Sequence, residues 1–296
     1  MELRETANGI IVNIAKREKT DTIIPPMMVV LVLLSYAVII TYYATTMYRE
    51  YGSNIPIAQL FSLVALFTIG IGLIVALFYL LMSRNVKHSE REKELRYYMI
   101  EYADANNYVC GADISNDIQK LKNINTEILA EENPAFRKNR LLYIGLPAIA
   151  GTLALLLVDL ETYAMQLVAI CYGMSIILAM FIAPSITVFP RQHERRAIEF
   201  YDEFNDIAVC IGIKTEKFDR KIGYRSFWVF LLISVLTLGI FLVYWGYLTF
   251  NDMNKHFLEQ WYYEDSLFKS IKSTETYFVE TEAERGKGYK LEDHWT

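Results

Sequence analysis

Long apolar runs alternate with polar segments along the chain. Five runs contain no Asp, Glu, Lys, Arg or His, and these are 26–48, 55–82, 141–158, 163–189 and 227–250. A helix rises ~1.5 Å per residue, so that roughly 20 apolar residues cross the hydrocarbon core of a bilayer. The pattern therefore predicts an all-α, polytopic helical membrane protein with about five transmembrane helices and helical inserts between them.

The same pattern divides the chain into seven segments. These are an N-terminal amphipathic segment at 1–25, a transmembrane hairpin at 26–82, a helical insert at 83–140, a second hairpin at 141–190, a shorter helical insert at 191–225, a fifth membrane segment at 226–250, and an amphipathic helix with a polar tail at 251–296. Residues 3–14 carry apolar side chains at helical spacing, which indicates either a helix lying on the membrane surface or a solvated terminus.

Positive charge distinguishes the two sides of the predicted membrane protein. Lys and Arg number four in residues 1–25, ten in 83–140 and eight in 191–225, against Arg49 alone in the connections 49–55 and 159–162. Positive residues beside membrane spans stay on the cytoplasmic side during insertion. The distribution predicts a multi-pass protein of the cell membrane with a cytoplasmic N-terminus and cytoplasmic inserts. The net charge of −5 adds little to this.

The first insert reads as two amphipathic helices. One apolar stripe consists of Leu95, Tyr98, Met99, Tyr102 and Val109, and the other of Ile114, Ile118, Leu121, Ile124 and Ile128. Both stripes have the period of a helix that buries one face. Gly111 is typical of a helix C-terminus and Ser115 of an N-cap, while Asn133-Pro134 ends the pair. We expect the two stripes to face each other in a small core.

An internal repeat is indicated by the histidines. His88 and His193 each follow a membrane run and begin an amphipathic stretch that ends near Cys110-Gly111 and Cys210-Ile-Gly212, respectively. His256 stands in a similar place after the fifth run. The hypothesis is a duplication with a partial third copy; chance similarity between apolar helices is the alternative.

The fifth run admits two interpretations. Its 24 residues fit one simple span, which we predict from length alone. A third repeat copy instead requires a hairpin that breaks at Thr237-Leu238-Gly239 and returns the C-terminal tail to the cytoplasm. The tail has six Lys and Arg against ten acidic residues, so its charge does not assign a side.

Candidate chemistry is sparse. His88, His193 and His256 could converge on a metal with Glu90, Glu194 or Glu259 nearby, but we find no i, i+4 pairing with another ligand of the kind that helical zinc sites require. We therefore predict helix-entry and interface roles for the histidines, no metal site and no cofactor. The three cysteines lack metal or disulfide spacing, and nucleotide-binding and hydrolase motifs are absent. The prediction is a protein that is not an enzyme, without catalytic residues.

The final segment resembles a known family. Arg225-Ser-Phe is followed by Leu236-Thr-Leu-Gly-Ile-Phe241, by Tyr244-Trp-Gly-Tyr247 and by a polar stretch to His256. This pattern over residues 223–266 is similar to the prokaryotic membrane domain of unknown function 4234, although Phe241 stands where that family usually has Tyr. The resemblance implies a bacterial or archaeal membrane protein and implies no activity.

Function is predicted from what the spans lack. Coupled transport uses ionisable groups inside the membrane, and the five runs contain none. Small residues in the runs and aromatic residues in the inserts favour helix packing and protein contacts. We predict a membrane scaffold or accessory subunit, embedded in the lipid bilayer and bound to a protein partner or to further copies of itself, without nucleic acid. The alternative is a transporter or channel subunit for a neutral or weakly coupled substrate.

Overall fold

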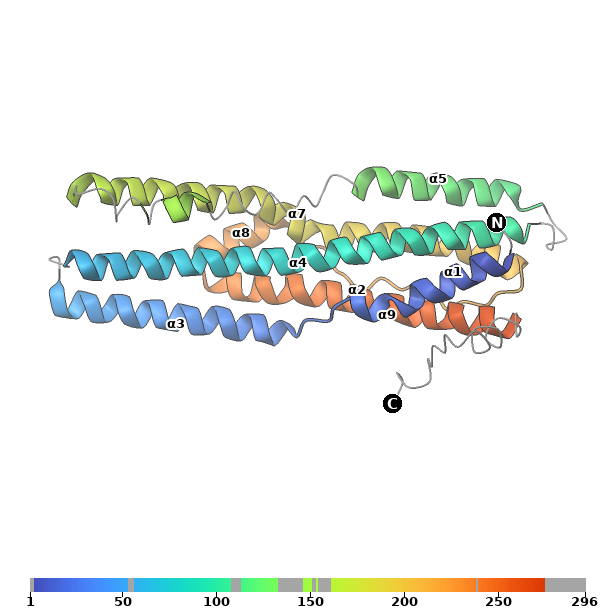
Figure 1. Ribbon diagram of the computed structural model, residues 1–296, viewed down its shortest axis with the longest axis horizontal. Helices are drawn as coiled ribbons and strands as arrows, with labels where there is room; N and C mark the ends of the chain where they lie inside the picture. Colours follow the sequence, from blue (N-terminus) through green and yellow to red (C-terminus); the bar gives the residue numbers. More distant parts are fainter. Residues whose placement is uncertain are drawn as a thin grey trace.

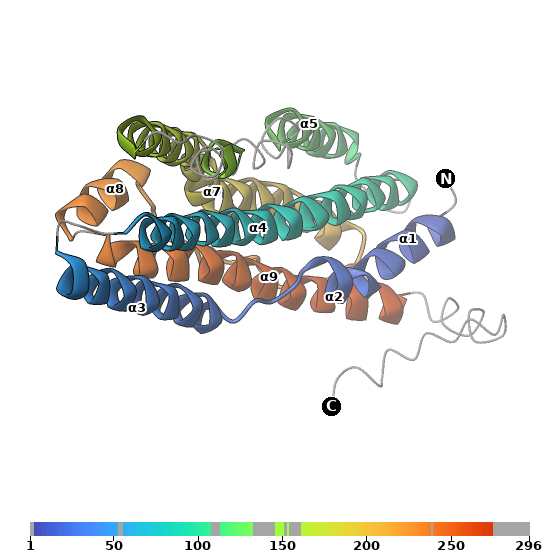
Figure 2. The same cartoon turned by 60° about the vertical axis from the view of Figure 1, so that its left-hand side comes forward.

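Helices make up the regular structure of the described chain. The computed structural model describes residues 3–52, 56–107, 113–132, 146–150, 153, 161–237 and 239–274, and these contain no strand. The helices are α1 (Leu3–Ala15), α2 (Arg17–Thr20), α3 (Pro26–Tyr51), α4 (Ile57–Ala105), α5 (Ser115–Glu132), α7 (Glu161–Cys210), α8 (Phe227–Leu236) and α9 (Ile240–Thr274). They lie side by side in an elongated bundle (Figures 1 and 2).

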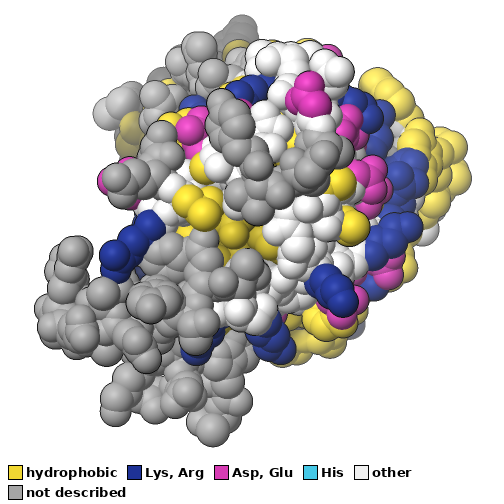
Figure 3. All heavy atoms as spheres, turned by 90° about the vertical axis from the view of Figure 1, so that its right-hand side faces the viewer, with side chains coloured by type: hydrophobic (Ala, Val, Ile, Leu, Met, Phe, Trp, Pro, Cys, Tyr) yellow, Lys and Arg dark blue, Asp and Glu magenta, His cyan; other side chains and the backbone are white. Residues whose placement is uncertain are grey.

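The bundle has an apolar half and a polar layer. The apolar half, toward the left in Figure 1, contains α3, α8 and the first parts of α4, α7 and α9. The polar layer, toward the right, contains α1, α2, α5 and the last parts of α4, α7 and α9. Its end carries Lys, Arg, Asp and Glu side chains (Figure 3).

Three described helices, α3, α4 and α7, are long and apolar enough to cross a membrane. Large apolar side chains on them face outward, such as Val38, 67% exposed, and Phe181, 77% exposed. This arrangement is compatible with a membrane protein. The predicted run 141–158 falls mostly outside the described residues.

The helices α4 and α7 pass from the apolar half into the polar layer without a break. With 49 residues, α4 extends ~74 Å at the ordinary helical rise, far beyond a hydrocarbon core of ~30 Å. The apolar stripe continues through Leu95, Met99 and Tyr102, which are buried. The predicted boundaries between membrane segment and insert, at 82/83 and 190/191, therefore fall inside continuous helices. At these positions the side chains change from apolar to polar, while the backbone stays helical.

The fifth run does not form the single straight helix predicted from its length. Helix α8 begins after Ser226, whose hydroxyl accepts the Val229 N–H, and it ends at Leu236. Gly239 has a positive φ of 89°, and its N–H donates to the Ser234 carbonyl. The Thr237 hydroxyl donates to the Ile233 carbonyl and accepts the Phe241 N–H. These contacts close one helix and open the next, so the chain turns back and α9 ends beside the ends of α4 and α7 (Figure 1).

The polar layer has one apolar core. The described members of both predicted stripes pack there: Leu95, Met99, Ile118 and Leu121 are among the buried ones, and Tyr98 and Ile124 are partly buried. Ser115 is the first residue of α5 and not its N-cap. Its backbone N–H donates a hydrogen bond to the Asp113 carboxylate. Val109, Gly111, Asn133 and Pro134 lie outside the described residues.

The N-terminal segment belongs to this core. Ala7, Ile10 and Ile14 of α1 are at most 3% exposed, and α1 packs along α4. The amphipathic helix was predicted, but its placement on a membrane surface or in solvent is wrong, because its apolar stripe completes the protein core. Residues 251–274 are helical as predicted, and the tail 275–296 lies outside the described residues.

Candidate metal centre

Helices α4, α7 and α9 each carry one histidine to the same point. His88 lies on α4, His193 on α7 and His256 on α9, and all three side chains are at most 1% exposed. The centre lies where the polar layer meets the apolar half, because the first charged residues after the apolar runs of these helices, Arg84, Arg191 and Asp252, precede the histidines by at most ~1 turn.

The three imidazoles converge through the same ring atom. His88 Nε2 lies 3.1 Å from His193 Nε2 and 3.2 Å from His256 Nε2. One ligand atom from each residue lies within 4.8 Å of the other two. Two nitrogens bound tetrahedrally to one Zn²⁺ at ~2.0–2.1 Å are ~3.3 Å apart. The two distances from His88 Nε2 therefore match edges of a metal coordination polyhedron.

The His88 ring is fixed by a carboxylate on one side and faces the other two imidazoles on the other. Asp21 Oδ1 lies 2.9 Å from His88 Nδ1, which fixes the proton on Nδ1 and leaves a lone pair on Nε2. Without a metal, His256 Nε2–H can donate to this lone pair and His193 Nε2–H to Glu92 Oε2, 3.0 Å away. A cation that displaces these two protons would engage one lone pair of each ring. A carboxylate on the far nitrogen of a histidine is also the usual support of a metal-bound imidazole.

The Glu92 carboxylate lies beside two of the three imidazoles. Its Oε2 lies 3.0 Å from His193 Nε2 and 4.0 Å from His88 Nε2. Arg96 Nη1 lies 3.0 Å from the same oxygen, and the Glu92 side chain is fully buried. The centre thus contains the donor set of three histidines and one carboxylate, which suits Zn²⁺ and other first-row transition metals.

The three acids considered as companions of the histidines have other surroundings. Glu194 is buried but accepts the backbone N–H groups of Lys221 and Ile222. Glu259 accepts the Asp219 N–H and pairs with Lys221, whereas Glu90 is exposed. Glu92 was missed although the sequence contains its signal, a carboxylate four residues after His88.

The electrostatics favour the metal-binding forms of these groups. Burial lowers the pKa of His88 and of His256, so both imidazoles are neutral at neutral pH, the form that binds metals. Burial opposes ionisation of Glu92, but Arg96 and His193 hold its pKa well below the usual range. His88 and His256 are therefore neutral, and the Glu92 carboxylate is anionic.

Aromatic rings surround the imidazoles. Phe189 stacks on His193 with centroids 5.2 Å apart, Phe257 lies 4.6 Å from the His88 ring, and Phe218 lies 5.7 Å from the His256 ring. All three phenylalanines are buried. This shell fixes the ring orientations and lowers the local dielectric, which strengthens a charge-assisted contact.

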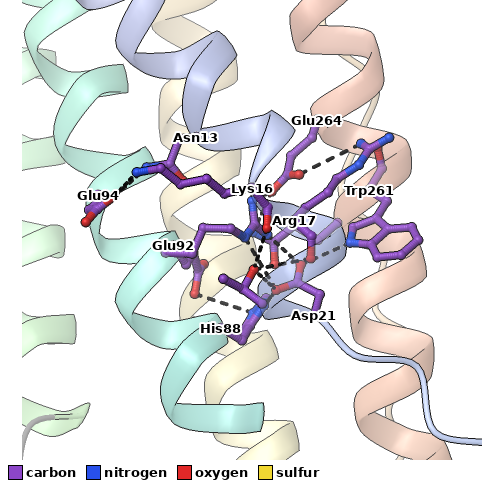
Figure 4. A network of polar contacts seen from close by, with 12 residues as sticks. Asn13, Lys16, Arg17, Asp21, His88, Glu92, Glu94, Trp261 and Glu264 are labelled. Atoms are coloured by element: carbon purple, nitrogen blue, oxygen red, sulfur yellow. Dashed lines mark hydrogen bonds and ion pairs between the residues drawn. The ribbon is translucent and has the colours of Figure 1, made fainter. Parts of the chain in front are cut away.

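A buried ion-pair network continues from the centre toward α9 and the N-terminus (Figure 4). Arg91 Nη2 lies 2.7 Å from Asp21 Oδ2, and Arg91 Nη1 lies 2.7 Å from Glu264 Oε1. The Trp261 indole N–H donates to Asp21, and Arg17 pairs with Asp265. The network ties α2 to both α4 and α9.

His88 and His193 lie at the same height in the bundle, as the duplication requires. The duplication itself stays a prediction, and the proposed equivalence of Cys110 and Cys210 is untested because Cys110 lies outside the described residues. Comparison with protein-family models, with curated proteins and with solved structures finds no match. The resemblance of residues 223–266 therefore also stays a prediction.

Proposed function

We propose that the protein is a membrane scaffold whose polar layer is held together by a transition-metal ion bound to His88, His193, His256 and Glu92. The observation that carries the proposal is the convergence of three buried imidazole nitrogens from three different helices within 4.8 Å. Zn²⁺ is the ion that we expect, since it prefers nitrogen ligands with a carboxylate in tetrahedral geometry.

A structural role for the ion is favoured over a catalytic one. Catalytic zinc keeps one position open to water or substrate, whereas structural zinc is enclosed by four protein ligands. Here the four donors are at most 1% exposed, and the aromatic shell packs around them. An enclosed ion links the helices without acting on a substrate, which is consistent with a protein that is not an enzyme.

The position of the ion explains what it would stabilise. It joins α4, α7 and α9 where they leave the apolar half, so their polar ends are held at fixed mutual angles (Figure 1). A rigid helical layer beside a membrane presents a constant surface to a partner. We propose that this layer is the partner-binding surface, in a prokaryotic membrane complex as the family resemblance implies.

The orientation of the scaffold can be tested directly. After removal of the native thiols, single cysteines at Gly111 and Gly212 should resist a membrane-impermeant thiol reagent in intact cells. Cysteines at Asn54 and Leu160 should react. The expectation rests on the distribution of Lys and Arg. Labelling at position 212 in intact cells would contradict a cytoplasmic polar layer.

Scaffolding and transport predict different behaviour after mild detergent extraction. A scaffold should purify with a stoichiometric protein partner or as a defined oligomer, measured by size-exclusion chromatography with light scattering. The absence of ionisable residues from the apolar runs supports this outcome. A monodisperse monomer that conducts ions in liposomes would overturn the proposal in favour of the channel.

A further inference from the structure

The N-terminal arm, residues 3–21, lies directly against the candidate metal centre. Its helix α1 packs along α4, and α2 brings Asp21 between α4 and α9 (Figures 2 and 4). Asp21 is 1% exposed and is the point at which the arm reaches the buried imidazoles. The arm is joined to α3 by residues 22–25, so its position depends on its own contacts.

Every charged or aromatic contact of Asp21 in this region comes from the helices that carry metal ligands. Its Oδ1 lies 2.9 Å from His88 Nδ1, and its Oδ2 accepts from Arg91 at 2.7 Å and from the Trp261 indole at 3.0 Å. His88 and Arg91 belong to α4, and Trp261 belongs to α9. A single carboxylate therefore connects the arm, one metal ligand and the partner helix.

We propose that the N-terminal arm retains the metal ion, with Asp21 positioning His88 for coordination and the docked arm closing the centre. This inference rests on the proposed metal function. The carboxylate holds the His88 proton on Nδ1 and orients the ring, so that Nε2 faces the ion. The ion in turn fixes His88 against Asp21. Because coupling between two binding events is reciprocal, arm docking tightens metal binding and metal binding strengthens arm docking. The docked arm also covers the centre and so slows release of the ion.

Two substitutions separate the roles of Asp21 and of the docked arm. Asp21→Asn keeps the volume but removes the charge that supports His88. Gly9→Val alters no side chain of the centre, but a Cβ at Gly9 would lie 2.2 Å from Tyr98 Cδ1, so the Tyr98 ring or the arm must shift and the docking of the arm on α4 is weakened. Gly72→Val is the matched control, because a Cβ at Gly72 meets nothing within 4 Å.

The decisive experiment measures metal release from the full-length protein in detergent. The protein is loaded with Co²⁺, whose visible absorption reports coordination, and an excess of chelator is added. Asp21→Asn and Gly9→Val should each accelerate release by ~10-fold or more, the usual effect of losing support for a metal ligand. Gly72→Val should release at the wild-type rate.

The reverse coupling is measured by hydrogen exchange in residues 3–21. Chelation should accelerate exchange of the arm in the wild type and leave it fast in Gly9→Val. If Asp21→Asn and Gly9→Val both release Co²⁺ at the wild-type rate, the proposed role of the arm is overturned while the metal centre remains in place. A wild-type protein that binds no Co²⁺ would instead overturn the proposed function itself.

Discussion

His256→Ala is expected to remove the stabilisation of the protein by zinc. The imidazole is fully buried and contributes one of the three converging nitrogens. Metal that binds only the folded state contributes its binding free energy to stability, ~2.7 kcal/mol at a free metal concentration 100 times the dissociation constant. The unfolding temperature of the wild type in detergent should rise with added Zn²⁺, and that of His256→Ala should not.

His294→Ala provides the matched control for this prediction. It removes the remaining histidine of the chain, which lies outside the proposed ligand set. The control should keep the full zinc response, so that a general effect of histidine loss is excluded. An equal rise of the unfolding temperature in His256→Ala and in the wild type would contradict the assignment of His256 as a ligand.

Arg91→Met is expected to be among the most destabilising single substitutions in the polar layer. The guanidinium lies 2.7 Å from both Asp21 and Glu264, and the three side chains are at most 1% exposed. Removing one member of a buried ion-pair network leaves buried charge uncompensated, which costs roughly 3–5 kcal/mol. Methionine keeps the apolar volume of the stem, so the loss reports the charge.

The comparison for Arg91→Met is Lys93→Met on the same helix. Lys93 is exposed, so its replacement should change the free energy of unfolding by no more than ~0.5 kcal/mol. Denaturant unfolding followed by tryptophan fluorescence measures both variants. A loss below ~1 kcal/mol for Arg91→Met would mean that Asp21 and Glu264 are neutral in the folded protein.

The sequence predicted the helices well because their signals are local. The spacing of Leu95, Met99 and Tyr102, and of Ile118 and Leu121, follows the helical period, and both stripes are buried. The predicted segment boundaries mark changes of polarity and not the ends of helices. Polarity changes at residue 82, but the backbone of α4 continues, since hydrogen bonds within the helix do not depend on the solvent around the side chains.

The fold of the fifth run depended on one backbone position. Length favoured a simple span, whereas Gly239 has a conformation that favours glycine and Thr237 caps both helices. The repeat had identified this break as the alternative. Composition could not decide between the two, because either conformation keeps the same apolar residues in the same environment.

The candidate site was only partly accessible from the sequence. The three histidines were recognised at equivalent positions, but their convergence depends on the packing of three helices that are far apart in the chain. Glu92 was within reach through its four-residue spacing from His88. The role of Asp21 could not be predicted from the sequence, because its partners His88 and Trp261 are 67 and 240 residues away in the chain.

The most direct test of the account is elemental analysis of the purified protein. Wild-type protein and His294→Ala, exposed to Zn²⁺ and then dialysed in detergent, should each retain about one zinc ion per chain. Under the same treatment, His88→Ala, His193→Ala and His256→Ala should retain close to none. A wild-type chain that keeps no more metal than these variants would contradict the metal centre.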